Sequence, residues 1–310
     1  MTDSLIQGAS THRYEWVDNW ALMPEGKRFG DTHAVCEVSD GRIFIHNGSP
    51  DSMAIFSPEG EFLESWGEEY AQGAHGMQLN VEDGGEYLYL AVTSQNFIVK
   101  TTLDGEVIFK LGYPESSGLY ESSEQYVPTN IAIAPSGDFY VADGYGLSYI
   151  HHYTPQGEYV KSWGGTGSGI GELDCPHGIW CDIRSGEPEL VVADRRNVRL
   201  QYFSLDGEHL RFVEEGLLFP CHFDQQGDDL LVVDLHGRIT ILDKNNEVIT
   251  QLFENPGVQD RDDYPDLPHS DRIPGKFISP HGACWDRSGN IFVGEWIPDG
   301  RITKLSRIKS

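Results

Sequence analysis

The pair His-Gly recurs at intervals of about a hundred residues, in AHGM (74–77), CPHG (175–178) and PHGA (280–283). Imidazole nitrogens bind zinc and other transition metals, and three neutral imidazoles with one open position are typical of a catalytic zinc site. The recurrence has a second explanation, in which an internal repeat places a hydrogen-bonded structural histidine at equivalent positions. The choice between a metal site and a repeated structural histidine depends on where each histidine lies within the repeat.

A repeat of four short strands runs through the chain, rich in glycine and aromatic residues. Its second strand carries apolar residues and ends near an acid, in GRIFIHN (41–47), EYLYLAV (86–92), GDFYVAD (137–143), PELVVAD (188–194), DDLLVVD (228–234) and GNIFVGE (289–295). Two further strands around a turn follow in each repeat. Six such units predict an all-β fold, a six-bladed β-propeller.

The sixth repeat is split between the two ends of the chain. After its second strand only RITKLSRI (301–308) remains, whereas RYEWVDNW (13–20) stands near the start with no strand expected before it. Pairing these two segments would complete the last blade and remove two open sheet edges. We therefore predict one domain over 1–310, with 1–12 as a flexible tail. A β-sandwich or a solenoid would not explain the split repeat.

The innermost strand of each blade begins at an equivalent position. Blades two, four and six carry His75, His177 and His281 there, so three imidazoles would converge on the axis from three sides. These are the predicted metal ligands. His33 holds the same position in blade one and is predicted to line the channel, with a fourth-ligand or second-shell role left open. Cys221 is a weak candidate ligand in blade five.

A second set of residues follows the second strands, on the face where the histidines are expected. Tyr145 follows FYVAD, Arg195 follows VVAD and His236 follows LVVD. A phenol near a metal can act as a general base, and a guanidinium can hold a carboxylate through two hydrogen bonds. Each can also be an ordinary stacking or ion-pair residue. The long segments 113–127 and 254–278 are either lids over the channel mouth or acidic, solvated insertions.

The composition excludes some partners. A formal net charge of −27 argues against nucleic acid and against an anionic membrane surface. No run of eighteen apolar residues is present, so no membrane span is expected. MTDSLIQGAS lacks the features of a secretory signal, and the five cysteines form no CxxC motif. We therefore expect reduced thiols and a cytoplasmic location.

Three segments resemble the catalytic core of peptidyl-α-hydroxyglycine α-amidating lyases, a group within the NHL-repeat propellers: 126–164, CPHGIWCD (175–182) and LVVADRRNVRLQYF (190–203). The resemblance extends over about 13–308. It implies a six-bladed propeller with an axial zinc ion held by three histidines. It also implies cleavage of a carbinolamide into an amide and an aldehyde acid. Matched by motif, the implied ligands are His75, His177 and His281, the catalytic tyrosine is Tyr145, and Arg195 is a functional arginine.

The sequence departs from the family at several motifs. Asn47, in IHNG, stands where the family has a second functional arginine. Gly282 replaces an aspartate that helps to bind a structural calcium ion in the family, which argues against calcium here. The family's disulfide positions are occupied by Gly146, Val191 and Tyr202. These departures indicate a retained metal site with an altered substrate pocket, in which Asn47 and His236 are candidate channel or second-shell residues.

The predicted function is a lyase that depends on zinc or another divalent transition metal. Its substrate would be an N-(α-hydroxyalkyl) amide or a similar small hemiaminal, with a carboxylate that Arg195 could hold. One alternative is a hydrolase or hydratase that uses the same three histidines on a small molecule. Another is a protein-binding propeller without enzymatic activity.

Overall fold

The computed structural model describes residues 5–309. These residues form six antiparallel sheets, which confirms the prediction of an all-β, six-bladed β-propeller. Contacts divide the chain into two compact units: unit 1 comprises Met1–Ala71 and Cys221–Ser310, and unit 2 comprises Gln72–Pro220. Within the described residues, no helix is long and apolar enough to cross a membrane.

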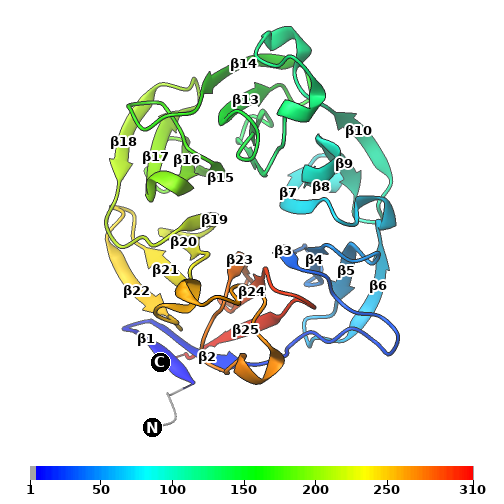
Figure 1. The fold of residues 1–310 in the computed structure, drawn as a ribbon, viewed down its shortest axis with the longest axis vertical. Coiled ribbons are helices and arrows are strands. Elements are labelled where there is room, and N and C mark those ends of the chain that lie inside the picture. Colours follow the sequence, from blue (N-terminus) through cyan, green and yellow to red (C-terminus); the bar gives the residue numbers. More distant parts are fainter. Residues whose placement is uncertain (1–4, 310) are drawn as a thin grey trace. The chain divides into compact units, whose positions relative to one another are not determined.

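Unit 2 contains three sheets in which every strand pairs with the next strand in sequence (Figure 1). The first sheet consists of β7 (Ala74–Glu82), β8 (Gly85–Val92), β9 (Phe97–Thr102) and β10 (Val107–Leu111). The second consists of β11 (Asn130–Ile133), β12 (Phe139–Ala142), β13 (Tyr149–Tyr153) and β14 (Tyr159–Gly164). The third consists of β15 (Pro176–Asp182), β16 (Glu189–Asp194), β17 (Arg199–Ser204) and β18 (His209–Val213). Strand β11 packs against both β7 and β15, so the three innermost strands are neighbours.

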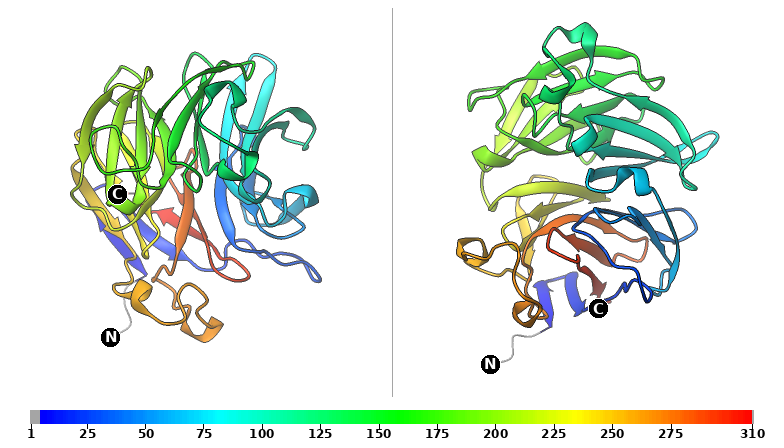
Figure 2. Two further views of the ribbon diagram at one scale, coloured as in Figure 1. Left: turned by 45° about the horizontal axis from the view of Figure 1, so that its top comes forward. Right: turned by 45° about the vertical axis from the view of Figure 1, so that its right-hand side comes forward.

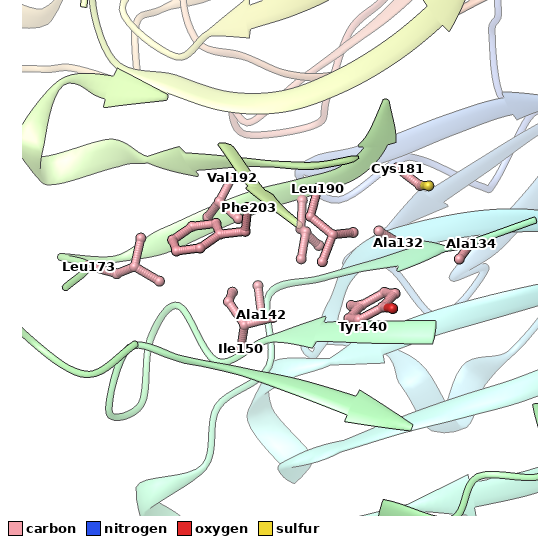
Figure 3. Close-up of a cluster of buried hydrophobic side chains, with 11 residues drawn as sticks. Ala132, Ala134, Tyr140, Ala142, Ile150, Leu173, Cys181, Leu190, Val192 and Phe203 are labelled. Atoms are coloured by element: carbon pink, nitrogen blue, oxygen red, sulfur yellow. The ribbon is translucent and has the colours of Figure 1, made fainter. Parts of the chain in front are cut away.

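A layer of apolar side chains fills the space between the second and third sheets of unit 2 (Figure 3). Tyr140 and Ile150 come from the second sheet, and Leu190, Val192 and Phe203 come from the third. All five side chains are buried, and burying one such large apolar side chain contributes roughly 1.5–3 kcal/mol. Both faces of these strands are covered, which is why segments such as FYVA and LVVA are continuously apolar.

Unit 1 contains the other three sheets. One consists of β3 (Thr32–Glu37), β4 (Ile43–Asn47), β5 (Met53–Phe56) and β6 (Phe62–Trp66). Another consists of β19 (Pro220–Gln226), β20 (Asp229–Asp234), β21 (Arg238–Leu242) and β22 (Val248–Leu252). The last has five strands in the order β1 (Ile6–Ala9), β2 (His12–Val17), β25 (Ile302–Arg307), β24 (Ile291–Glu295) and β23 (Pro280–Trp285).

The N-terminal strand completes the last sheet, as predicted from the split repeat. Strand β2 pairs antiparallel with β25 and places Trp16 opposite Leu305. The expectation that this strand has nothing before it is wrong, because β1 pairs with its outer edge. The sequence IQGA of β1 is short and largely exposed, so it lacks the apolar alternation that marks a strand. Of the predicted tail 1–12, residues 1–4 lie outside the described residues.

Short 3-10 helices occupy several connections. Unit 2 contains η2 (Thr93–Gln95), η3 (Glu115–Ser117), η4 (Ser123–Gln125) and η5 (Arg195–Asn197), and unit 1 contains η1 (Glu68–Tyr70), η6 (Val258–Asp260) and η7 (His269–Asp271). The long segment 254–278 carries η6 and η7 and projects from the strands of unit 1 (Figure 2, orange). Within it, Arg261 forms ion pairs with Asp263 and Asp271.

Candidate metal centre

The first His-Gly pair lies at the start of β7 in unit 2. The Nδ1 atom of His75 is 2.7 Å from the carbonyl oxygen of Thr129, directly before β11. The amide of Gly76 donates to the same oxygen at 3.0 Å, and a Cβ atom at position 76 would lie 2.4 Å from it. Only glycine allows this approach of the two inner strands. A carbonyl can only accept, so Nδ1 carries the proton and the Nε2 atom of His75 keeps its lone pair.

The same arrangement occurs in unit 1 at the start of β23. The Nδ1 atom of His281 is 2.9 Å from the carbonyl oxygen of His33, and a Cβ atom on Gly282 would lie 2.3 Å from that oxygen. The Nε2 atom of His281 therefore also keeps its lone pair. Histidine ligands of metals commonly donate their other N–H group to a backbone carbonyl, which fixes the ring and its tautomer. The donor chemistry of both histidines thus fits a zinc ligand.

Unit 2 brings together three of the residues predicted from the sequence. The hydroxyl oxygen of Tyr145 lies 3.2 Å from Nε2 of His75 and 2.9 Å from Nε2 of His177. The two imidazole rings are 4.8 Å apart between centroids. Both histidines are buried, whereas the Tyr145 side chain is 42% exposed. The phenol therefore joins two candidate ligand nitrogens at a place that solvent and a small molecule can reach.

The turn that carries Tyr145 is held by a buried carboxylate. Asp143 accepts hydrogen bonds at 2.7 Å from the backbone amides of Val127 and Leu147. It also accepts the hydroxyl of Tyr120 at 2.7 Å. Burial raises the pKa of Asp143 to about 6, although these hydrogen bonds act in the opposite direction. Asp143 therefore has a structural role, in which it holds the turn after β12 through backbone amides.

A buried histidine extends this network. The Nε2 atom of His151 lies 2.6 Å from the Tyr120 hydroxyl, and its Nδ1 atom lies 2.7 Å from the hydroxyl of Ser162. Burial lowers the pKa of His151 to about 3, so its ring is neutral at pH 7. Neither Tyr120 nor His151 was predicted as part of the site. No motif marks them, since Tyr120 is one of three tyrosines in the long segment 113–127 and His151 lies within β13.

Arg195, predicted to lie on the same face as the histidines, has its guanidinium group beside the Tyr145 ring. Its guanidinium carbon is 5.4 Å from the centre of the Tyr145 ring and 5.0 Å from that of Phe219. The Nη2 atom donates to the Sγ atom of Cys175 at 3.2 Å. Burial raises the pKa of the Cys175 thiol, so the sulfur is a neutral acceptor at pH 7. The arginine thus combines a largely buried side chain with a position next to the candidate base.

In unit 1, His33 lies against the third predicted ligand. The rings of His33 and His281 are 4.6 Å apart, and ligand nitrogens of the two residues lie within 4.8 Å of each other. The Nε2 atom of His33 is 2.9 Å from a carboxylate oxygen of Asp31. This hydrogen bond is the main cause of the lowered pKa of Asp31. His33 is therefore a buried neighbour of His281 with an acidic partner; channel lining stays the prediction for it, with a ligand or second-shell role as the open alternatives.

Two other candidates are engaged by the backbone. The Oδ1 atom of Asn47 accepts the amides of Gly30 and Ser49, and its Nδ2 atom donates to the carbonyls of residues 51 and 52. The thiol of Cys221 lies 3.3 Å from the carbonyl oxygen of Val233 and 3.4 Å from that of residue 281. Both side chains are fully buried, so Asn47 shapes a turn and Cys221 packs between strands.

The remaining candidate, His236, follows β20 in unit 1. Its ring lies 6.2 Å from that of Tyr264, a residue of the long segment 254–278. The hydroxyl of Tyr264 contacts the carbonyl oxygen of Leu235 at 2.9 Å and the hydroxyl of Ser279 at 3.0 Å. The long segment is thus anchored at the turn that carries His236.

The fold defines the protein as a six-bladed β-propeller. In sequence it resembles peptidyl-α-hydroxyglycine α-amidating lyases. It is 29% identical over 171 residues to a peptidyl-glycine alpha-amidating monooxygenase of Mus musculus, which is 53% of this chain and 17% of that protein. It is 28% identical over 198 residues to peptidyl-alpha-hydroxyglycine alpha-amidating lyase 1 of Drosophila melanogaster, which is 59% of this chain and 36% of the relative. The chain therefore matches only a minor part of each relative.

Solved structures support the fold alone. A streptogramin B lyase superposes with a TM-score of 0.64 at 12% identity, over 94% of this chain and 97% of that chain. A gluconolactonase from Xanthomonas campestris superposes with a TM-score of 0.62 at 12% identity, over 95% of this chain and 89% of that chain. No protein-family model matches the chain.

Proposed function

We propose that the protein is a metal-dependent lyase that acts on a small N-(α-hydroxyalkyl) amide or a similar hemiaminal. The observation that carries this proposal is the Tyr145 hydroxyl, which lies within hydrogen-bond distance of Nε2 of both His75 and His177. The similarity to amidating lyases supports the reaction class. A cytoplasmic small metabolite, as predicted from the sequence, is the proposed substrate class.

His75, His177 and His281 are the proposed ligands, and zinc is the proposed metal. The lone pairs left on Nε2 by the carbonyl contacts of His75 and His281 support this choice. Iron, manganese and cobalt are also bound by imidazole and remain alternatives. Zinc bound by three imidazoles supplies a Lewis acid that makes a hydroxyl group of a bound molecule easier to deprotonate.

The side chains around Tyr145 suggest how the reaction proceeds. In its deprotonated form, the phenolate oxygen of Tyr145 accepts the proton of the substrate hydroxyl as the C–O bond gains double-bond character and the C–N bond breaks. The proton is then delivered to the departing nitrogen, which gives an amide or amine and an aldehyde or keto acid without consuming water. Arg195 binds a carboxylate of the substrate, because its largely buried guanidinium is weakly hydrated and suited to two parallel hydrogen bonds.

The test is metal content, measured by plasma mass spectrometry on untagged protein. We expect about one transition-metal ion per chain. This ion should be lost in His177→Ala and retained in His269→Ala, a matched control because the His269 side chain is 74% exposed. Wild-type protein without stoichiometric metal, even after addition of zinc, would overturn the proposal.

Product analysis then tests the reaction itself. A carbinolamide with a carboxylate should release an aldehyde acid from wild-type protein but not from Tyr145→Phe, which keeps the histidines and removes the phenol oxygen. Incorporation of solvent oxygen-18 into the product at the moment of cleavage would point to a hydrolase. Sampling must be faster than the spontaneous hydration exchange of the aldehyde.

A further inference from the structure

A cavity of about 450 Å³ lies within unit 1, outside the cluster formed by Tyr145. It is lined by Asp31, Pro265, Asp266, Trp296, Ile297 and Pro298. Asp31 directly precedes β3, Trp296 directly follows β24, and the residues at 265 and 266 belong to the long segment 254–278. This volume falls in the range of pockets that hold small molecules.

The lining has a particular chemistry. Two side chains are carboxylates, one is an indole, the other three are apolar, and none is basic. The Asp31 side chain is 47% exposed and Trp296 is 36% exposed, so both can contact a molecule in the cavity. The electron-rich face of an indole attracts organic cations, and carboxylates add direct charge attraction. An anion would be repelled by the same residues.

The apolar lining residues indicate that the cation carries carbon. A hydrated metal ion would gain nothing from Pro265 and Pro298, whereas an alkylammonium group would bury its carbon atoms against them. Asp31 also accepts the hydrogen bond from His33, whose ring packs against His281. The cavity is therefore connected through one side chain to a predicted metal ligand of the same unit.

We propose that this cavity binds an alkylammonium group. The proposal stands on the lining of the cavity and does not rest on the proposed function.

Binding is tested by titrating the full-length protein, as purified, with choline and with 3,3-dimethylbutan-1-ol. The two probes have nearly the same shape, and only choline is charged. We expect saturable calorimetric binding of choline that is at least about tenfold tighter than binding of the alcohol. Trp296→Leu and Asp266→Asn should each weaken choline binding several-fold. Asp262→Asn is the matched control, because Asp262 is exposed on the same segment and does not line the cavity.

Equal binding of the two probes would overturn the proposal, because the charge would then contribute nothing. An equal loss in the Asp262→Asn control would also overturn it, since the overall negative charge would explain the attraction.

Discussion

Replacing Tyr120 with phenylalanine tests whether the buried network holds the turn that carries Tyr145. The substitution removes one hydroxyl, which donates to Asp143 at 2.7 Å, and leaves the ring in its aromatic surroundings. A hydrogen bond to a charged group contributes about 1.5–3 kcal/mol. We therefore expect Tyr120→Phe to lower the free energy of unfolding by about 2 kcal/mol at pH 8, where Asp143 is ionised.

The effect should depend on pH in a defined direction. The folded-state pKa of Asp143, about 6, lies above its ordinary value of 3.8, so the folded protein holds this proton more tightly than the unfolded chain does. The unfolded chain thus releases this proton at lower pH than the folded protein does. As the pH rises from about 4 to 6, Asp143 therefore lowers the free energy of unfolding by about 3 kcal/mol in total. The Tyr120 hydroxyl lowers this pKa, so its removal raises the pKa further. The loss in Tyr120→Phe should be larger at pH 8 than at pH 5.

The measurement is urea unfolding at pH 5 and pH 8, together with amide hydrogen exchange of Val127 and Leu147. Both amides donate to Asp143 and should exchange faster in the variant. Tyr113→Phe is the control, because this ring packs against Tyr120 at 5.8 Å and, within the described residues, its hydroxyl makes no hydrogen bond to Asp143. The same loss at both pH values, or the same loss in the control, would refute the reasoning.

Three further outcomes are expected. Gly76→Ala places a Cβ atom 2.4 Å from the Thr129 carbonyl oxygen, so the protein should lose bound metal and its melting temperature should fall, as seen by metal analysis and calorimetry. Arg184→Ala leaves the carboxylate of Asp182 buried without its bidentate partner. The free energy of unfolding, measured in urea, should therefore fall by about 3–5 kcal/mol, and an unchanged unfolding midpoint would contradict this. Arg195→Gln should raise KM for a carboxylate-bearing carbinolamide at least about tenfold, with little effect on its methyl ester, and an equal effect on both would exclude carboxylate binding.

Much of the fold could be predicted from local patterns. Strands such as FYVA and LVVA, the turns between them, and the split last repeat are visible in neighbouring residues, and the pairing of β2 with β25 followed from the need to cover two edges. Strand β1 could not be predicted in this way. Its residues are mostly exposed and are held by backbone pairing with β2, which requires no apolar pattern.

The residues of the candidate site could be predicted from the sequence, but the contacts that hold them in place could not. Repeat positions selected His75 and His177, and the motif that follows β12 selected Tyr145. The carbonyl of Thr129 that fixes the His75 tautomer, and the chain of contacts through Tyr120, join residues far apart in sequence. Such contacts depend on how strands pack against one another, which no local spacing reveals. The close approach of a neighbouring carbonyl oxygen also gives Gly76 and Gly282 a structural cause that is separate from metal binding.

The assignment of strands to the two units has a consequence for synthesis of the protein. Unit 2 is one continuous segment, so its three sheets can form once Pro220 has left the ribosome. Unit 1 contains residues from both ends of the sequence. Strand β2, with Trp16, can pair with β25 only after Leu305 has been synthesised. Until then the inner edge of β2 is an unpaired strand edge, open to association with another chain. Its closure is a contact of very long sequence separation, which places it among the slow events of folding and exposes this edge to aggregation until synthesis ends.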